Sequence, residues 1–231
     1  MSIITIASTK GGVGKSTFLI NLASIFINED KKIAVLDADA QNTVSKWNRV
    51  REFMISEGAP LKQMFVASAR GNTLLEIAQD KKQQGYTVLI DSPGVDDSNM
   101  RAALLRSDYI FTLCSPSPVE LWEVDSLLKI IRNLQKIQNR KIPLALIFNK
   151  VPPTHSETSI SDAIKFFEEN NILPDYILKS PIKERVVFKH SIRDGKGVID
   201  YSPLDQKAKR EMYNCYNEII NIIDKKQTTI I

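Results

Sequence analysis

The hydrophobic positions of the chain follow two alternating patterns. Short apolar runs with little polar alternation recur along the sequence, and longer segments whose apolar residues return every three or four positions separate them. Strands are therefore expected over residues 3–7, 32–37, 64–68, 86–91, 109–114, 143–149 and 175–178. Because strands of this type are covered on both faces, the pattern predicts an α/β fold, a mostly parallel twisted β-sheet flanked by helices on both faces.

Two helical segments carry apolar stripes that we expect in the core. The stripe of the segment 119–138 consists of Trp122, Leu127, Leu128, Ile131 and Leu134. The last helix, over about residues 203–224, is expected to direct inward Met212, Tyr216, Ile219, Ile220 and Ile223. Both helices should then lie against the sheet.

Length and composition narrow the class of protein. A chain of 231 residues suits one α/β domain over residues 1–231. Its two cysteines, Cys114 and Cys215, have neither disulfide nor metal-ligand spacing, so both are interpreted as packing residues of a protein from a reducing cytosol. No apolar run approaches the ~20 residues of a membrane span and no signal peptide is recognised, so a soluble, cytoplasmic protein is expected. The net charge of +4 is compatible with nucleic-acid binding but does not establish it.

A glycine-rich stretch, "STKGGVGKST" at residues 8–17, joins the first expected strand to a helical pattern. Gly14, Lys15 and Ser16 fit the end of the phosphate-loop pattern G-x-x-x-x-G-K-[ST], whereas Thr9 stands at the place of its first glycine. Glycines allow backbone N–H groups to surround phosphate oxygens, and the following helix directs the positive end of its dipole at the anion. We expect Lys15 to reach the β- and γ-phosphates and the Ser16 hydroxyl to bind Mg²⁺.

Three aspartates follow apolar runs that are expected to be strands. Asp37 and Asp39 follow the run in "AVLDADAQ", and Asp91 follows the run in "VLIDSPG". Functional loops of an open parallel sheet gather at the carboxyl ends of its strands, so these carboxylates should lie near the phosphate loop. A carboxylate in this position is expected to support Mg²⁺ for phosphoryl transfer, although an aspartate at a strand end is also a common turn former.

These motifs resemble those of a known family. "KGGVGKST" resembles the deviant Walker A motif of the ParA/MinD class of P-loop ATPases, whose mark is the additional lysine, here Lys10. "DADAQ" is similar to the second motif of that class and "LIDSPG" to its Walker B strand and switch, with Ala40 at a position that is usually proline. The stretches "SPSPVELWEVDSL", "FNK" and "VVFKHSIRDGKGVIDYSP" resemble later blocks of the small ParF-like ParA proteins, so the resemblance covers essentially the whole chain.

The resemblance implies an ATPase that uses ATP and Mg²⁺ and turns over slowly without a partner. Two subunits would sandwich two ATP molecules, with Lys10 of each acting in trans on the phosphates bound by the other, and Asp39 would orient the attacking water. The implied catalytic residues are Lys10, Lys15 and Asp39. The implied metal-supporting residues are Ser16, Asp37 and Asp91. The implied nucleotide-binding residues are Lys10, Gly11, Gly12, Val13, Gly14, Lys15, Ser16, Thr17 and Asn149. Asn149 matches a position that often meets the adenine, and it is equally an ordinary turn residue.

The function that the resemblance implies is DNA partition or cargo positioning. An ATP-bound homodimer would bind double-stranded DNA without sequence preference, associate with the nucleoid, and be released when a ParB-like adaptor stimulates hydrolysis. No N-terminal helix-turn-helix domain precedes the loop, so operator binding is not expected. The candidate DNA-binding residues are Lys183, Arg185, Lys189, Arg193, Lys196, Lys207, Lys209 and Arg210. Acidic residues lie among them, and a run of charges is often only a solvated helix face.

Three other functions are possible for a P-loop protein of this kind. A MinD-like membrane-associated regulator would need a terminal amphipathic helix with a free apolar face, and "DKKQTTII" is too short for one. A metabolic ligase of the dethiobiotin synthetase type would share the fold, but Lys10 and the C-terminal blocks argue against it. An iron–sulfur reductase would need exposed cysteines near the dimer face, which Cys114 and Cys215 do not provide.

Overall fold

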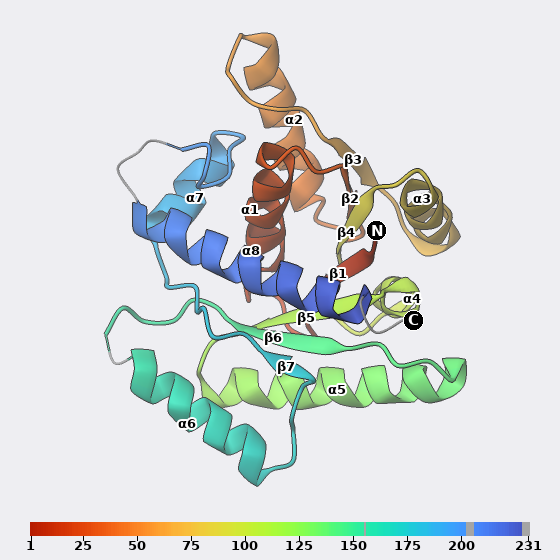
Figure 1. Ribbon diagram of the computed structural model, residues 1–231, viewed down its shortest axis with the longest axis vertical. Coiled ribbons are helices and arrows are strands. Elements are labelled where there is room, and N and C mark those ends of the chain that lie inside the picture. Colours follow the sequence, from red (N-terminus) through yellow and green to blue (C-terminus); the bar gives the residue numbers. More distant parts are fainter. Residues whose placement is uncertain (155, 202–205, 228–231) are drawn as a thin grey trace.

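Seven parallel strands form the sheet around which the chain is built (Figure 1). The computed structural model describes residues 1–154, 156–201 and 206–227. The strands are β1 (Ile3–Ala7), β2 (Ile33–Asp37), β3 (Phe65–Ser68), β4 (Thr87–Asp91), β5 (Tyr109–Cys114), β6 (Leu144–Phe148) and β7 (Tyr176–Ile177). The helices are α1 (Lys15–Asn28), α2 (Thr43–Ser56), α3 (Gly71–Gln83), α4 (Ser98–Arg106), α5 (Pro118–Gln138), α6 (Ser156–Glu169), α7 (Val186–Arg193) and α8 (Gln206–Gln227).

The order of the strands places the phosphate loop near the middle of the sheet. The order is β3-β2-β4-β1-β5-β6-β7, so β1 lies between β4 and β5. In this arrangement Asp37 at the end of β2 is the register partner of Asp91 at the end of β4. The predicted α/β fold with a parallel sheet is confirmed.

Helices cover both faces of the sheet, as the continuous apolar runs predict. Every residue of β1 is buried. Ile4 and Ile6 pack in a core with α1, α7 and α8, whereas Ile3 and Ala7 pack in the cores on the other side. This alternation follows from the period of two along a strand, which sends neighbouring side chains to opposite faces.

The predicted core stripe of α5 is correct for four of its five residues. Leu127, Leu128, Ile131 and Leu134 are buried, but Trp122 is 58% exposed. Nine residues separate Trp122 from Ile131, which is two and a half helical turns, so the two side chains leave the helix on opposite sides. Leu121 and Val124 continue the buried stripe at this end.

The last helix packs against the sheet with the face that the sequence predicts. Met212, Tyr216, Ile219 and Ile223 of α8 are buried, and Ile220 is partly buried against the same core. The helix begins at Gln206, and residues 203–205 of the predicted segment lie outside the described residues.

Both cysteines are packing residues, as predicted. Cys114 and Cys215 are free and buried, and burial raises the pKa of both thiols far above its ordinary value. Thiols held in this protonated form are poor nucleophiles and poor metal ligands. Among the described helices, none combines the length and the apolar character needed to cross a membrane.

Candidate nucleotide-binding site

The phosphate loop runs from the end of β1 to the start of α1. Gly12 and Gly14 have φ of 83° and 100°, which lies in the left-handed region where a side chain is strained. A Cβ on Gly14 would also approach Asn149 Nδ2 to 2.5 Å. No side chain caps the N-terminus of α1, so the first backbone N–H groups of this helix are available to bind an anion.

The side chain of Lys15 lies buried beneath this loop. Its Nζ donates a hydrogen bond of 3.1 Å to the Ser8 hydroxyl. Burial lowers the pKa of Lys15, and the charges of Asp91 and Asp39 partly oppose that effect. A Cβ on Gly94 would meet Gly11 Cα at 3.0 Å and Lys15 Nζ at 3.1 Å, so the loop after β4 rests directly on the phosphate loop.

The predicted Walker B carboxylate meets the predicted metal-binding hydroxyl. Ser16 Oγ donates a hydrogen bond of 2.6 Å to Asp91 Oδ2. Asp91 is fully buried, and burial raises its pKa to about 7. The hydrogen bond from Ser16 and the charge of Lys15 lower that pKa, whereas the charge of the neighbouring Asp37 raises it further. The site therefore holds two carboxylates behind Ser16 with little solvent to screen them.

The residues around Ser16 fit a magnesium ion. Asp37 Oδ2 accepts a hydrogen bond of 2.8 Å from the Ser45 backbone N–H, but Asp37 Oδ1 and Asp91 Oδ1 are buried without a partner among the described residues. Buried polar atoms are normally satisfied, and a hard cation with its water shell satisfies carboxylate oxygens. Within the described ranges no group of three or more His, Cys, Asp or Glu side chains could hold a metal, so a hydroxyl and phosphate oxygens would complete the coordination.

Asp39 lies in the loop between β2 and α2. Its Oδ1 accepts a hydrogen bond of 2.8 Å from the Gln41 backbone N–H, and the residue lines the pocket over the phosphate loop. Arg70, which the sequence analysis missed, donates to the backbone carbonyls of Ala38 and Asp39 and to the Asn42 side chain. The Arg70 guanidinium therefore fixes the path of this loop.

Lys10 lies apart from Lys15. Its side chain is 40% exposed, and its Nζ lies 3.9 Å from Glu120 Oε1. The described residues that line the pocket include Gly11, Gly12, Gly14 and Lys15, but they do not include Lys10. The neighbouring Thr9 donates a hydrogen bond of 2.6 Å to Glu123 Oε2, which ties the start of the loop to α5. Lys10 thus lies outside the pocket of its own subunit.

The pocket itself has a volume of about 710 Å³, within the usual range of small-molecule sites. It extends from the phosphate loop past Asn149 and Lys150 to Phe188 of α7. Asn149 Nδ2 donates a hydrogen bond of 2.8 Å to the Val13 carbonyl, and Lys150 Nζ donates to the Gly12 carbonyl. Asn149 therefore braces the phosphate loop beside the pocket. Lys150, which contacts the same loop, was not among the residues predicted from the sequence.

Comparison with known families agrees with this geometry. A family model described as the CobQ/CobB/MinD/ParA nucleotide binding domain matches residues 4–198. The chain belongs to this family.

Relatives of this CobQ/CobB/MinD/ParA family member are distant but cover most of the chain. Protein virC1 of Rhizobium radiobacter is 27% identical over 81% of this chain and 79% of its own length. Maintenance of carboxysome distribution protein A of Halothiobacillus neapolitanus is 22% identical over 94% of this chain and 95% of its own. A plasmid partition protein of Borrelia burgdorferi B31, solved with bound AMPPNP, aligns with a TM-score of 0.65 and 20% identity, covering 97% and 99% of the two chains.

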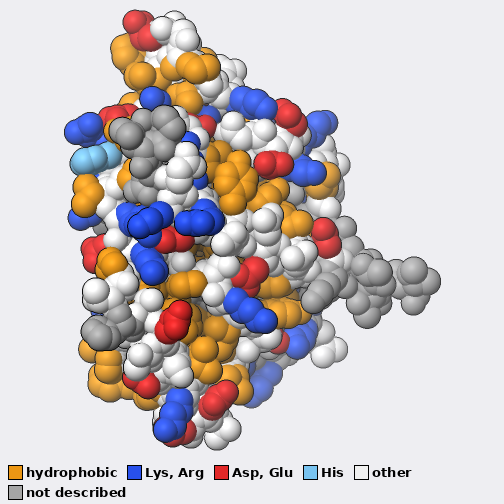
Figure 2. Space-filling view, turned by 60° about the vertical axis from the view of Figure 1, so that its left-hand side comes forward, with side chains coloured by type: hydrophobic (Ala, Val, Ile, Leu, Met, Phe, Trp, Pro, Cys, Tyr) orange, Lys and Arg blue, Asp and Glu red, His pale blue; other side chains and the backbone are white. Residues whose placement is uncertain are grey.

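The candidate DNA-binding residues of this family member do not form one uniform surface. Lys183, Arg185 and Lys189 line the nucleotide pocket, and Arg185 pairs with Glu211. Figure 2, which brings the side of α7 and α8 forward, shows Lys and Arg side chains gathered on that face with Asp and Glu side chains among them.

The remaining basic candidates lie on α7, on the turn after it and on α8. Arg193 at the end of α7 pairs with Asp194, and Lys196 lies over the ring of Tyr201. The candidates on α8 are Lys207, Lys209 and Arg210.

Proposed function

We propose that the chain is an ATP-dependent partition or cargo-positioning ATPase that works as an ATP-bound homodimer. The observation that supports this most directly is the position of Lys10. It lies beside the phosphate loop but outside the pocket of its own subunit, with one distant ionic contact to Glu120. An ammonium group in this position is suited to reach phosphates that a second subunit presents, and it would offset repulsion between the two charged faces.

Within each subunit, different residues bind the phosphates, bind the metal ion and orient the attacking water. Lys15 and the backbone N–H groups of the loop hold the β- and γ-phosphates. Ser16, Asp37 and Asp91 would hold Mg²⁺, which would supply neutralisation of charge on the phosphate oxygens. Asp39 orients the attacking water. Since phosphoryl transfer needs mainly alignment and charge neutralisation, turnover is slow until a partner completes the alignment.

The ATP-bound dimer holds DNA through basic residues of the C-terminal part and is released by a ParB-like adaptor on the cargo. Contacts of this kind are made to phosphates and carry no sequence information. The protein is accordingly cytoplasmic and associated with the nucleoid. The distribution function in the name of the Halothiobacillus relative and the plasmid partition function in the name of the Borrelia protein support this proposal. The apolar face of α8 is packed in the core, which disfavours a membrane-bound regulator.

The proposal is tested by retention of the protein on non-specific duplex DNA at fixed salt, with ATP, ADP or no nucleotide. ATP alone should support retention, Lys10→Ala should abolish it, and Asp39→Ala should prolong it. Lys129→Ala is the matched control, because Lys129 is an exposed lysine that pairs with Asp125 on α5. Retention that does not depend on nucleotide would contradict the proposal.

A further inference from the structure

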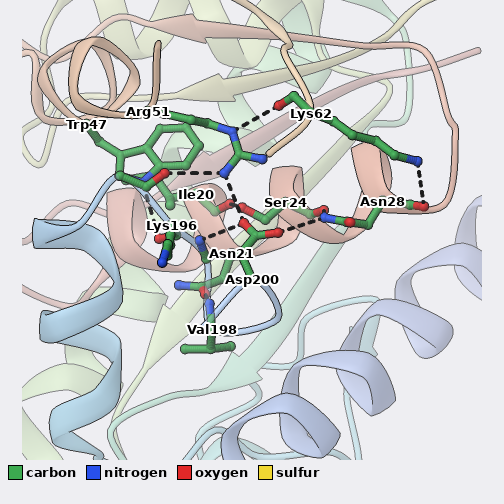
Figure 3. A network of polar contacts seen from close by, with 12 residues as sticks. Ile20, Asn21, Ser24, Asn28, Trp47, Arg51, Lys62, Lys196, Val198 and Asp200 are labelled. Atoms are coloured by element: carbon green, nitrogen blue, oxygen red, sulfur yellow. Dashed lines mark hydrogen bonds and ion pairs between the residues drawn. The ribbon is translucent and has the colours of Figure 1, made fainter. Parts of the chain in front are cut away.

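A buried ion pair joins α2 to the segment that follows α7. Arg51 of α2 is fully buried, and its Nη1 lies 2.9 Å from Asp200 Oδ2, with side chains only 1% and 6% exposed (Figure 3). The same nitrogen donates to the Gly195 carbonyl at 3.3 Å, and Nε donates to the Lys62 carbonyl at 3.0 Å. We name residues 194–201 the clamp segment.

The clamp segment packs against α2 without room for adjustment. Gly195 has φ of 67°, and a Cβ there would lie 2.6 Å from the Arg51 backbone nitrogen. Trp47, one turn before Arg51, donates its indole N–H to the Lys196 carbonyl at 3.2 Å. The Trp47 ring and the Arg51 guanidinium and backbone thus hold the clamp segment against two consecutive turns of α2.

The clamp segment is also held by α1, the helix that follows the phosphate loop. The Val198 backbone N–H donates a hydrogen bond of 2.7 Å to Asn21 Oδ1. Asn28 Nδ2 donates to Asp200 Oδ1 at 3.0 Å, as Figure 3 shows. The segment therefore spans the two helices whose N-terminal ends lie at the nucleotide site.

The first turn of α2 reaches the candidate metal site directly. The Ser45 backbone N–H donates to Asp37 Oδ2, and the other oxygen of Asp37 faces no partner among the described residues. One helix of 14 residues therefore contacts the metal-side carboxylate through Ser45 and the clamp segment through Trp47 and Arg51, within the next two turns. Backbone hydrogen bonds of the helix connect its first turn to Arg51, so a displacement of Ser45 at Asp37 would also displace Arg51.

We propose that Arg51 is a positioning residue that couples the nucleotide site to the clamp segment and, through it, to the basic residues Lys189, Arg193 and Lys196. The coupling rests on the proposed function, for which it supplies the link between ATP binding and DNA binding. The pair is suited to this role because separating two buried charges leaves each without compensation. Helix α2 and the clamp segment must then move together. An exposed pair could break and re-form in water at little cost.

The guanidinium also has an unused donor. Arg51 Nη2 is buried and has no hydrogen-bond acceptor among the described residues. A buried donor is normally satisfied, so a joint shift of α2 and the clamp segment that brings Nη2 to an acceptor on a neighbouring element would give a second stable arrangement. Coupling between two sites requires an element with two such arrangements.

Hydrogen–deuterium exchange on the wild-type chain tests the coupling without any substitution. Amides of the phosphate loop, residues 11–17, should become protected when Mg²⁺ and ATPγS are added, and amides of residues 194–201 should change their exchange in parallel. Protection of the loop with no change in the clamp segment would overturn the coupling alone. An unprotected loop would instead contradict nucleotide binding, and the proposed function with it.

Variants of the pair give a second, functional test. Asp200→Asn and the double variant Arg51→Met/Asp200→Asn should bind ATPγS as the wild type does, but their ratio of DNA retention with ATP to retention with ADP should fall by about fivefold or more. Asp30→Asn is the matched control, because Asp30 pairs with Lys62 beside the network but is 85% exposed. An unchanged ratio in variants that still bind nucleotide would overturn the role of Arg51.

One result separates the two proposals. If the wild type holds DNA equally with ATP and ADP while the clamp segment still responds to ATPγS, the DNA-binding part of the proposed function and the link to the basic residues fail, and only the coupling of the nucleotide site to the clamp segment stands.

Discussion

The hydroxyl of Ser16 donates a hydrogen bond of 2.6 Å to Asp91 Oδ2, at the point where the phosphate loop meets the end of β4. The two partners are separated by 75 residues in the sequence, so the contact depends on the pairing of β1 with β4 in the sheet. It joins the first turn of α1 to a carboxylate whose pKa burial raises to about 7. The protonation of Asp91 is therefore linked both to folding and to the binding of a cation.

The nucleotide-free protein should lose stability as the pH rises toward neutrality. Asp91 has a pKa of about 7 in the folded state and an ordinary value of 3.8. Between these pH values the unfolded chain has released a proton that Asp91 of the folded chain retains. The contribution of Asp91 to the free energy of unfolding is therefore fully present below pH 3.8 and is lost as the pH rises through about 7. The Tm of the wild type should fall across this window, by about 2–4 °C per kcal/mol, and Asp91→Asn should remove that part of the fall.

The control for this prediction is Asp96→Asn. Hydrogen bonding to Arg101 lowers the pKa of Asp96, so this carboxyl titrates below the window. The variant should keep the pH dependence of the wild type, and an Asp91→Asn protein with an unchanged slope would contradict the prediction. Affinity for Mg²⁺ and nucleotide should rise with pH over the same window, since cation binding requires the ionised carboxylate.

Gly94→Ala should weaken nucleotide binding more than it weakens the fold. The new Cβ would press on Gly11 Cα and Lys15 Nζ at 3.0 and 3.1 Å, which displaces the phosphate loop. Equilibrium titration with ATPγS should show a loss of about tenfold, equal to about 1.4 kcal/mol. Gly85→Ala is the control, because Gly85 has φ of 84° and open space around it. It should lower the Tm through backbone strain and leave the affinity unchanged.

Glu120→Gln should favour dimerisation with ATP. Glu120 is the ionic contact of Lys10 at 3.9 Å, and its other oxygen accepts a hydrogen bond from the Ser115 backbone N–H, which a glutamine can preserve. The pair contributes about 0–1 kcal/mol to stability because Lys10 is exposed. Sedimentation with ATPγS should show a larger dimer fraction than in the wild type. Asp125→Asn, which removes a pair on the same helix, should not change that fraction.

Trp122→Ala should leave the fold nearly as stable as the wild type. The side chain is 58% exposed, so its truncation opens no cavity. Chemical denaturation should give a change in unfolding free energy within about 0.5 kcal/mol. Leu121→Ala, one position earlier and buried, should cost about 2–5 kcal/mol. Equal costs for the two variants would show that Trp122 belongs to the core after all.

The sequence by itself determined the architecture and the identity of the phosphate loop. Both depend on local signals: the period of two or 3.6 along an element, and glycines whose spacing suits a phosphate. The gathering of Asp37 and Asp91 beside Ser16 was also predictable, because parallel strands bring their carboxyl ends to one edge. What these residues do chemically stays a prediction.

The tertiary structure alone decided the contacts between distant parts of the chain. Arg51 and Asp200 are separated by 149 residues, and no pattern in the sequence predicts that they form a pair. Arg70 and Lys150 join the site because packing brings their loops to it, and packing also sets the close approach of Gly94 to Gly11. The exposed side of Trp122 likewise follows from how α5 is rotated against the sheet. A local pattern fixes which residues share a face, but the packing of one element on another fixes what that face meets.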